Sequence, residues 1–146
     1  MNRIWEITAL QTEARESYEE WGDRPDSGTG EIFSVDKGGL PVGIIGWFEY
    51  GDFPDILRLR YYGIVPSERG NGHGEAAMSL FLEHLSKAAP PHAAFLSESV
   101  SLGRAAAPIV LTHFKKMGFE EFEDPNYGSN AGCGKVRSLK IRIPGR

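Results

Sequence analysis

Residues 69–74 read Arg-Gly-Asn-Gly-His-Gly and stand between a β-branched and aromatic run that ends at Pro66 and a helical pattern that starts at Glu75. Glycine adopts positive φ angles without steric cost and lets the backbone approach a ligand closely. Successive N–H groups in such a segment can converge on an anion at the N-terminus of the following helix. The segment therefore predicts a cradle for a phosphate-bearing ligand.

Two familiar nucleotide-binding loops do not fit this segment. A Walker A loop needs Lys and Ser or Thr directly after its last glycine, whereas Gly74 is followed by Glu75 and Ala76. A Rossmann loop has the spacing G-x-G-x-x-G in a first βαβ unit. Here Gly70, Gly72 and Gly74 are spaced G-x-G-x-G. An ordinary tight turn into a helix is the structural alternative, but one glycine would be enough for it.

Length and composition predict one globular domain over residues 1–146. The chain has 40% hydrophobic and 25% charged residues and a single cysteine, Cys133, which is ordinary for a globular protein without a disulfide scaffold. The N-terminus has no charged and apolar leader, and no apolar run approaches 18 residues, so we expect a cytoplasmic protein that is not bound to a membrane.

The charge distribution says more than the net charge of -4. That net charge argues against nucleic acid as a partner, because phosphate backbones need a basic surface. Seven acidic residues lie between Glu13 and Glu31, and five basic residues lie between Lys135 and Arg146. An acidic segment can steer a cationic substrate, and a basic end can bind an acidic partner, although a solvated surface explains either one. The four histidines show no spacing typical of a metal site.

Hydrophobic periodicity predicts the order of the elements. Strand patterns cover residues 3–10, 31–36, 40–50, 56–65, 93–99, 119–122 and 136–143, and helical patterns cover residues 12–21, 75–88 and 108–117. The strand, helix, strand unit over residues 56–99 needs a crossover connection and hence one parallel pair. We therefore expect an α/β (α+β) fold: one mixed, mostly antiparallel sheet with helices on both faces.

Alternation in the run 56–65 predicts which side chains share a face of the sheet. A period of two places Leu57, Leu59 and Tyr61 on one face and their alternates on the other, namely Arg58, Arg60 and Tyr62. Gly63 is the expected position of a β-bulge that separates this strand from its neighbour.

Two blocks together resemble the GNAT superfamily of N-acetyltransferases. The first is R-x-x-G-x-G, formed by Arg69, Gly72 and Gly74 after a strand end; the second is residues 114–119, Phe-Lys-Lys-Met-Gly-Phe. They stand 44 residues apart (118 minus 74), with a helix, a strand and a helix between them. The strand order matches the same family from Arg3 to Ile143, so the resemblance covers nearly the whole chain.

The resemblance implies acetyl-CoA as co-substrate and no metal. The glycine loop would hold its pyrophosphate and the preceding strand end its pantetheine arm. The implied cofactor-binding residues are Ile64, Val65, Arg69, Gly70, Asn71, Gly72, His73, Gly74, Glu75 and Phe114. It also implies transfer of the acetyl group to an amine acceptor by direct attack in a ternary complex, and it leaves a homodimer open.

The catalytic groups are less well defined. Many members of the family have a tyrosine, taken as the acid for the thiolate, where this chain has Phe114. Tyr62 and Tyr127 are the substitutes that the chain offers. Glu98, near the end of a strand, is the leading candidate for the base, or else it pairs with an arginine, namely Arg58, Arg60 or Arg104. A catalytically impaired module that binds acyl-CoA or a protein partner is the alternative to an enzyme.

We predict that Gly72→Asp weakens binding of CoA, because it places a carboxylate where a phosphate belongs. The helix should stay intact, which circular dichroism would check. Unchanged affinity for CoA in a calorimetric titration would contradict the assignment of the glycine segment as a phosphate cradle.

Overall fold

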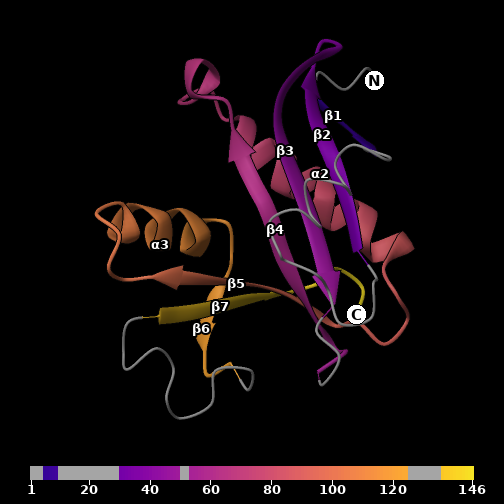
Figure 1. Ribbon diagram of the computed structural model, residues 1–146. Coiled ribbons are helices and arrows are strands. Elements are labelled where there is room, and N and C mark those ends of the chain that lie inside the picture. Colours follow the sequence, from indigo (N-terminus) through magenta and orange to yellow (C-terminus); the bar gives the residue numbers. More distant parts are fainter. Residues whose placement is uncertain (1–4, 10–29, 50–52, 125–135) are drawn as a thin grey trace.

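The computed structural model describes residues 5–9, 30–49, 53–124 and 136–146, with only the backbone for residues 5–9 (Figure 1). The elements are β1 (Trp5–Ala9), β2 (Gly30–Lys37), β3 (Leu40–Glu49), β4 (Ile56–Ile64), the short 3-10 helix η1 (Pro66–Glu68), α2 (His73–Ala88), β5 (Phe95–Ser101), α3 (Ala107–Lys116), β6 (Glu120–Phe122) and β7 (Val136–Arg142). The helix predicted over residues 12–21 lies outside the described residues.

The seven described strands form one mixed sheet in the order β1-β2-β3-β4-β5-β7-β6. Among them, β4 and β5 make the one parallel pair, and α2 lies in the connection between them. All other neighbours are antiparallel. This confirms the predicted fold class and the predicted parallel pair. The helical pattern predicted a start at Glu75, but α2 begins two residues earlier, at His73.

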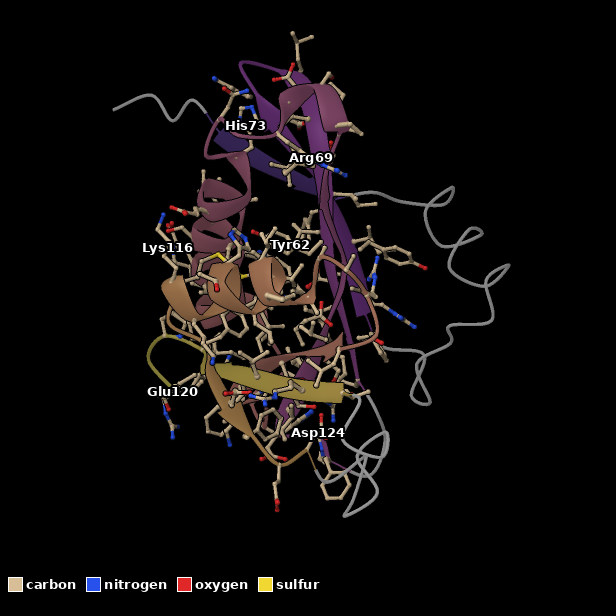
Figure 2. All side chains as sticks on the ribbon, turned by 90° about the vertical axis from the view of Figure 1, so that its left-hand side faces the viewer. Tyr62, Arg69, His73, Lys116, Glu120 and Asp124 are labelled. Atoms are coloured by element: carbon tan, nitrogen blue, oxygen red, sulfur yellow. The ribbon has the colours of Figure 1, made fainter. Side chains whose placement is uncertain are left out.

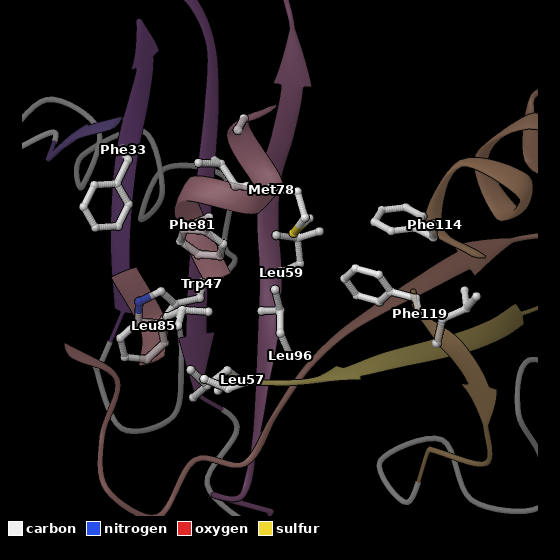
Figure 3. Packing of buried hydrophobic residues seen from close by; sticks show 14 of the residues in the cluster. Phe33, Trp47, Leu57, Leu59, Met78, Phe81, Leu85, Leu96, Phe114 and Phe119 are labelled. Carbon is white, nitrogen blue, oxygen red and sulfur yellow. The ribbon is translucent and has the colours of Figure 1, made fainter. Parts of the chain in front are cut away.

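The apolar face of α2 forms the centre of the hydrophobic core (Figure 3). Phe81 is fully buried and its ring lies edge-on to Phe33 of β2, with 5.9 Å between ring centroids. The other buried apolar residues of the helix, Ala77, Met78 and Leu85, lie at helical spacing, as the periodicity over residues 75–88 predicts. Phe114 and Phe119 continue the same core on the β5 side, with ring centroids 5.1 Å apart. The helices and both halves of the sheet therefore share one core.

β4 carries one extra residue opposite β3. Ile44 pairs with Gly63 and Gly46 pairs with Arg60, so two steps along β3 face three steps along β4. Tyr61 takes up the extra residue with a φ of 53°, in the left-handed region that side chains rarely adopt. The bulge thus lies at Tyr61, and not at Gly63 as the sequence pattern suggested.

The bulge reverses the predicted facing of the two tyrosines. Tyr62 packs against the main core with Leu57 and Leu59, whereas Tyr61 packs against a small cluster on the other face, formed by Ile32 and Phe48. The alternation prediction for Tyr61 and Tyr62 was therefore wrong. A single inserted residue shifts every later side chain of a strand to the opposite face.

β4 and β5 separate after only three paired residues. The pairs are Ile56 with Phe95, Leu57 with Leu96 and Arg58 with Ser97. Beyond these pairs β4 continues to Ile64 beside β3 and no longer pairs with β5. β5 pairs along its whole length with β7. We call the point of separation, after Arg58 and Ser97, the fork; Figure 1 shows β5 and β7 turning away from β2, β3 and β4 there.

A buried ion pair holds the closed end of the fork. The Arg58 guanidinium donates to both carboxylate oxygens of Asp124, with 2.8 Å from Nη2 to Oδ1, and Nη1 donates to Ser97 Oγ at 3.1 Å. Arg58 is 6% exposed and Asp124 4%. Removal of one partner would leave the other charge buried and uncompensated, which is strongly destabilising.

We predict that Gly43→Ala destabilises the fold by roughly 2 kcal/mol or more, because the new methyl would clash with the carbonyl oxygen of Gly63. Gly63→Ala is the matched control on the facing strand. Its methyl would meet nothing within 4 Å, so its effect should stay within about 0.5 kcal/mol. Urea unfolding of both variants measures the difference, and equal losses would contradict the close approach of β3 to β4.

Candidate functional site

The glycine segment connects the end of β4 to the start of α2. Gly70 and Gly72 have φ angles of 85° and 77°, and Gly72 occupies the position that precedes the helix. A side chain at either glycine would meet nothing within 4 Å. The backbone of residues 70–72 is therefore open on the side that a side chain would otherwise cover.

The N-terminus of α2 offers backbone donors to this open space. The first bond inside the helix runs from the Ala76 N–H to the Gly72 carbonyl, at 3.1 Å, and no side chain caps the helix end. The N–H groups ahead of Ala76 have no acceptor within the helix, and they lie at the positive end of its dipole. This arrangement suits an anion, as the sequence predicted.

The polar side chains beside the glycines contact other groups of the same loop and of the end of β4. The exposed Arg69 donates from Nε to the carbonyl oxygen of Ile64 at 2.9 Å, and Asn71 Nδ2 donates to the Glu68 carbonyl at 3.2 Å. His73 is only 2% exposed, and its Nε2 lies 3.2 Å from Glu68 Oε2. His73 therefore packs under the loop, while Arg69 stays at the surface beside it (Figure 2).

Gly74 is closely packed. A methyl at Gly74 would lie 2.8 Å from Tyr62 Oη and 3.7 Å from His113 Cε1. The third glycine thus lets the first turn of α2 approach β4 and α3. It differs in this from Gly70 and Gly72, where a side chain would meet open space.

Tyr62 and His113 share a hydrogen bond between β4 and α3. Tyr62 Oη lies 2.8 Å from His113 Nε2 and 3.7 Å from the thioether sulfur of Met117. Burial raises the pKa of Tyr62, and the negative charge of Glu75 raises it further. Burial also lowers the pKa of His113, against the opposing effect of Glu75. Both groups are consequently neutral at pH 7.

Phe114 fills the position that the resemblance gives to an acid. Its ring is 3% exposed and its centroid lies 5.8 Å from that of Tyr62. A phenyl ring donates no proton, but the Tyr62 ring brings a hydroxyl into the same neighbourhood from β4. The bulge at Tyr61 places the Tyr62 ring beside Phe114, because without it Tyr62 would face the other side of the sheet.

Glu98 lies at the fork. It is the residue of β5 directly after Ser97, where the pairing with β4 ends, and its Oε1 accepts a hydrogen bond from the Ser99 N–H at 2.8 Å. Burial raises its pKa to about 7, although that N–H and the charges of Arg60, Arg104 and Arg58 oppose the rise. A carboxylate with this pKa exchanges protons near neutral pH.

The positive charges of Arg60, Arg104 and Arg58 act on Glu98, but no ion pair between Glu98 and an arginine is found among the described residues. Arg58 binds Asp124. Nothing in the sequence pointed to Asp124 as that partner, because it is 66 residues from Arg58. Tyr127 and Cys133 lie outside the described residues.

Within residues 5–9, 30–49, 53–124 and 136–146, no group of three or more His, Cys, Asp or Glu side chains is arranged to hold a metal ion. No helix in these residues is long and apolar enough to cross a membrane.

Comparison with solved structures identifies the fold. No family model and no curated protein matches the sequence. The spermidine N-acetyltransferase of Vibrio cholerae in complex with CoA and spermine is similar in structure, with a TM-score of 0.66, 14% identity and 97% of each chain covered. The N-acetyltransferase PseH of Campylobacter jejuni gives 0.61 and 11%, covering 96% of this chain and 99% of that one. An acetyltransferase of the GNAT family from Desulfovibrio desulfuricans gives 0.64 and 13%, covering 95% and 98%. The chain has the GNAT acyl-CoA N-acyltransferase fold over nearly its whole length.

Proposed function

We propose that this protein is an acetyl-CoA-dependent N-acetyltransferase. The observation that carries the proposal is the separation of β4 from β5 after Arg58 and Ser97, with the open glycine loop beyond the end of β4 and Glu98 at the fork. A pantetheine arm would lie between the separated strands, with its amides along the backbone of β4. A thioester lying along it would have its phosphates at the cradle and its reacting end toward the fork.

The residues of the co-substrate site follow from that placement. Backbone N–H groups at Gly70, Asn71 and Gly72 and the guanidinium of Arg69 suit the pyrophosphate. Ile64 and Val65 supply the strand end, His73, Gly74 and Phe114 support the site by packing, and Glu75 lies in the first turn of α2 beside the phosphates. The structures of similar fold include one with CoA bound, which supports this choice of ligand.

Glu98 is the proposed general base and Tyr62 the proposed acid. The Glu98 carboxylate takes a proton from the ammonium form of the acceptor, and the neutral amine attacks the acetyl carbonyl carbon. The C–N bond forms, the C–S bond breaks, and the thiolate sulfur receives the hydroxyl proton of Tyr62. The second proton of the attacking nitrogen leaves to solvent. Glu98 then releases its proton to solvent, and Tyr62 regains its proton from solvent.

The proposed acceptor is a cationic amine of a small molecule or a protein. The acidic stretch from Glu13 to Glu31 supports a cationic acceptor by electrostatic steering. One structure of similar fold has spermine bound. The test is thiol release from acetyl-CoA with polyamines, aminoglycosides and lysine or N-terminal peptides. Binding of CoA without turnover of any of these amines would favour the impaired module instead, for which Phe114 is the one specific observation.

We predict that Glu98→Gln lowers kcat/KM by about 100-fold. In the native protein kcat/KM should rise with pH through about 7, because Glu98 accepts a proton only as the carboxylate. The variant should lose this rise and keep only the rise that belongs to the amine itself. Glu121→Gln is the control, since the Glu121 carboxylate pairs with Lys115 and Arg137 at the surface.

A stability measurement separates catalysis from misfolding in this variant. The pKa of Glu98 is raised above the ordinary 4.5 by folding, so the native protein loses stability relative to Glu98→Gln as the pH rises from about 4.5 to about 7. The variant should therefore be at least as stable as the native protein above pH 7. If kcat/KM depended on pH in the same way in both proteins, the role of Glu98 as base would be contradicted.

We predict that Tyr62→Phe lowers kcat by about tenfold or more, and that adding Phe114→Tyr to it restores part of the loss. The two rings are neighbours, so a hydroxyl at residue 114 can replace the one removed. Phe114→Tyr alone should change kcat little. A gain from the single change Phe114→Tyr would show instead that the acid is missing from this protein, and a loss that it does not rescue would point to a structural role for Tyr62.

A further inference from the structure

Two carboxylates border the phosphate cradle, and each one contacts a base. Glu68 Oε2 lies 3.2 Å from His73 Nε2, and Glu75 Oε1 lies 3.1 Å from Lys116 Nζ. Glu75 belongs to the first turn of α2, where a carboxylate stabilises the helix dipole but also repels an anionic ligand. The cradle therefore carries an acidic residue that bound phosphate would have to tolerate, beside a lysine that could offset it.

Lys116 reaches this position from α3. It is in the last turn of α3, and its contact with Glu75 bridges the C-terminal end of α3 and the N-terminal end of α2. Figure 2 shows Lys116 and Arg69 on different sides of the Tyr62 region, one from α3 and the other from the loop after β4. Two cations from separate elements thus lie near the helix end that offers the backbone donors.

The Glu75–Lys116 contact is exposed and easily exchanged. The Lys116 side chain is 71% exposed and that of Glu75 49%, and ion pairs of this kind contribute little to stability. A phosphate carries more negative charge than a carboxylate and offers more acceptor oxygens. The lysine ammonium can therefore leave the carboxylate for a phosphate without a large loss.

The backbone that carries Lys116 is anchored to the cradle more firmly than its side chain. The hydrogen bond from Tyr62 to His113, three residues before Lys116, holds the last turn of α3 against β4. Gly74 brings the first turn of α2 against the same tyrosine hydroxyl. Both helix ends thus contact the same side chain of β4, whereas Lys116 has an exposed and flexible four-carbon side chain.

We propose that Lys116 is a second phosphate-binding cation of the cradle, paired with Glu75 when the cradle is empty and moved to the phosphates of acyl-CoA when it is filled. Glu75 then acts as a competitor that lowers the affinity for the carrier. This inference rests on the proposed function, because it takes CoA as the ligand of the cradle. Lys116 belongs to α3, so this proposal adds a residue that lies outside both the glycine loop and the end of β4.

The test is calorimetric binding of CoA to Lys116→Gln and to Lys115→Gln. Lys115 is the matched control, because it is adjacent in α3 and pairs at 3.1 Å with Glu121, away from the cradle. Lys116→Gln should weaken CoA binding about three- to tenfold at low ionic strength, a difference that shrinks as salt screens the charge. Lys115→Gln should bind as the native protein does. Pantetheine, which has no phosphate, should bind all three proteins equally.

Glu75→Gln should change the affinity for CoA in the direction opposite to Lys116→Gln. Loss of the competing carboxylate should tighten CoA binding about two- to fivefold, with Lys116 still present. If the pair served only to hold α2 against α3, both variants would lower the melting temperature together and neither would shift CoA affinity in this way. Equal affinity in Lys116→Gln and Lys115→Gln, or weaker binding in Glu75→Gln, would overturn the proposal.

The same titrations distinguish this inference from the proposed function. Absence of CoA binding to the native protein would remove the proposed function itself. Binding that is weakened by Gly72→Asp but not by Lys116→Gln would leave the cradle in place and remove only the role of Lys116.

Discussion

The separation of β4 from β5 after three paired residues is the constraint on which the rest of the molecule depends. A strand with an unpaired edge exposes N–H and C=O groups that must find partners. β5 satisfies its own other edge by pairing with β7, and β4 satisfies its other edge by pairing with β3. Beyond the fork, no other described strand takes the place of β5 beside β4, and β4 leads directly to the glycine loop.

Several distant residues keep the fork in that shape. The buried Arg58–Asp124 pair, with Ser97 as a third partner, joins β4, β5 and the segment after β6 at the closed end. The bulge at Tyr61 directs Tyr62 into the core, where its hydroxyl contacts α3 and abuts Gly74 of α2. Both helix ends are thereby placed relative to β4, so the cradle and the fork belong to one rigid frame.

The charged groups at the cradle and those at the fork have different environments. At the cradle the charges are exposed and paired loosely, as in Glu75 with Lys116, so a bound anion can rearrange them. At the fork Glu98 is half-buried, and this burial raises its pKa to about 7 against the opposing charges of Arg60, Arg104 and Arg58. The glycine loop and the fork therefore differ in how firmly their charged groups are held.

The sequence by itself determined the fold class, the order of the described elements and the place of the glycine loop between β4 and α2. These depend on local properties: periodicity, the conformational freedom of Gly70 and Gly72, and the order of segments along the chain. The tertiary structure alone decided the facing of Tyr61 and Tyr62, the packing role of Gly74, and the partners of Arg58 and Lys116. Each of these results from a contact between segments far apart in the sequence or from one inserted residue in a strand. A periodic pattern contains no information about which residue of a strand lacks a partner opposite it, or which helix end will lie against it.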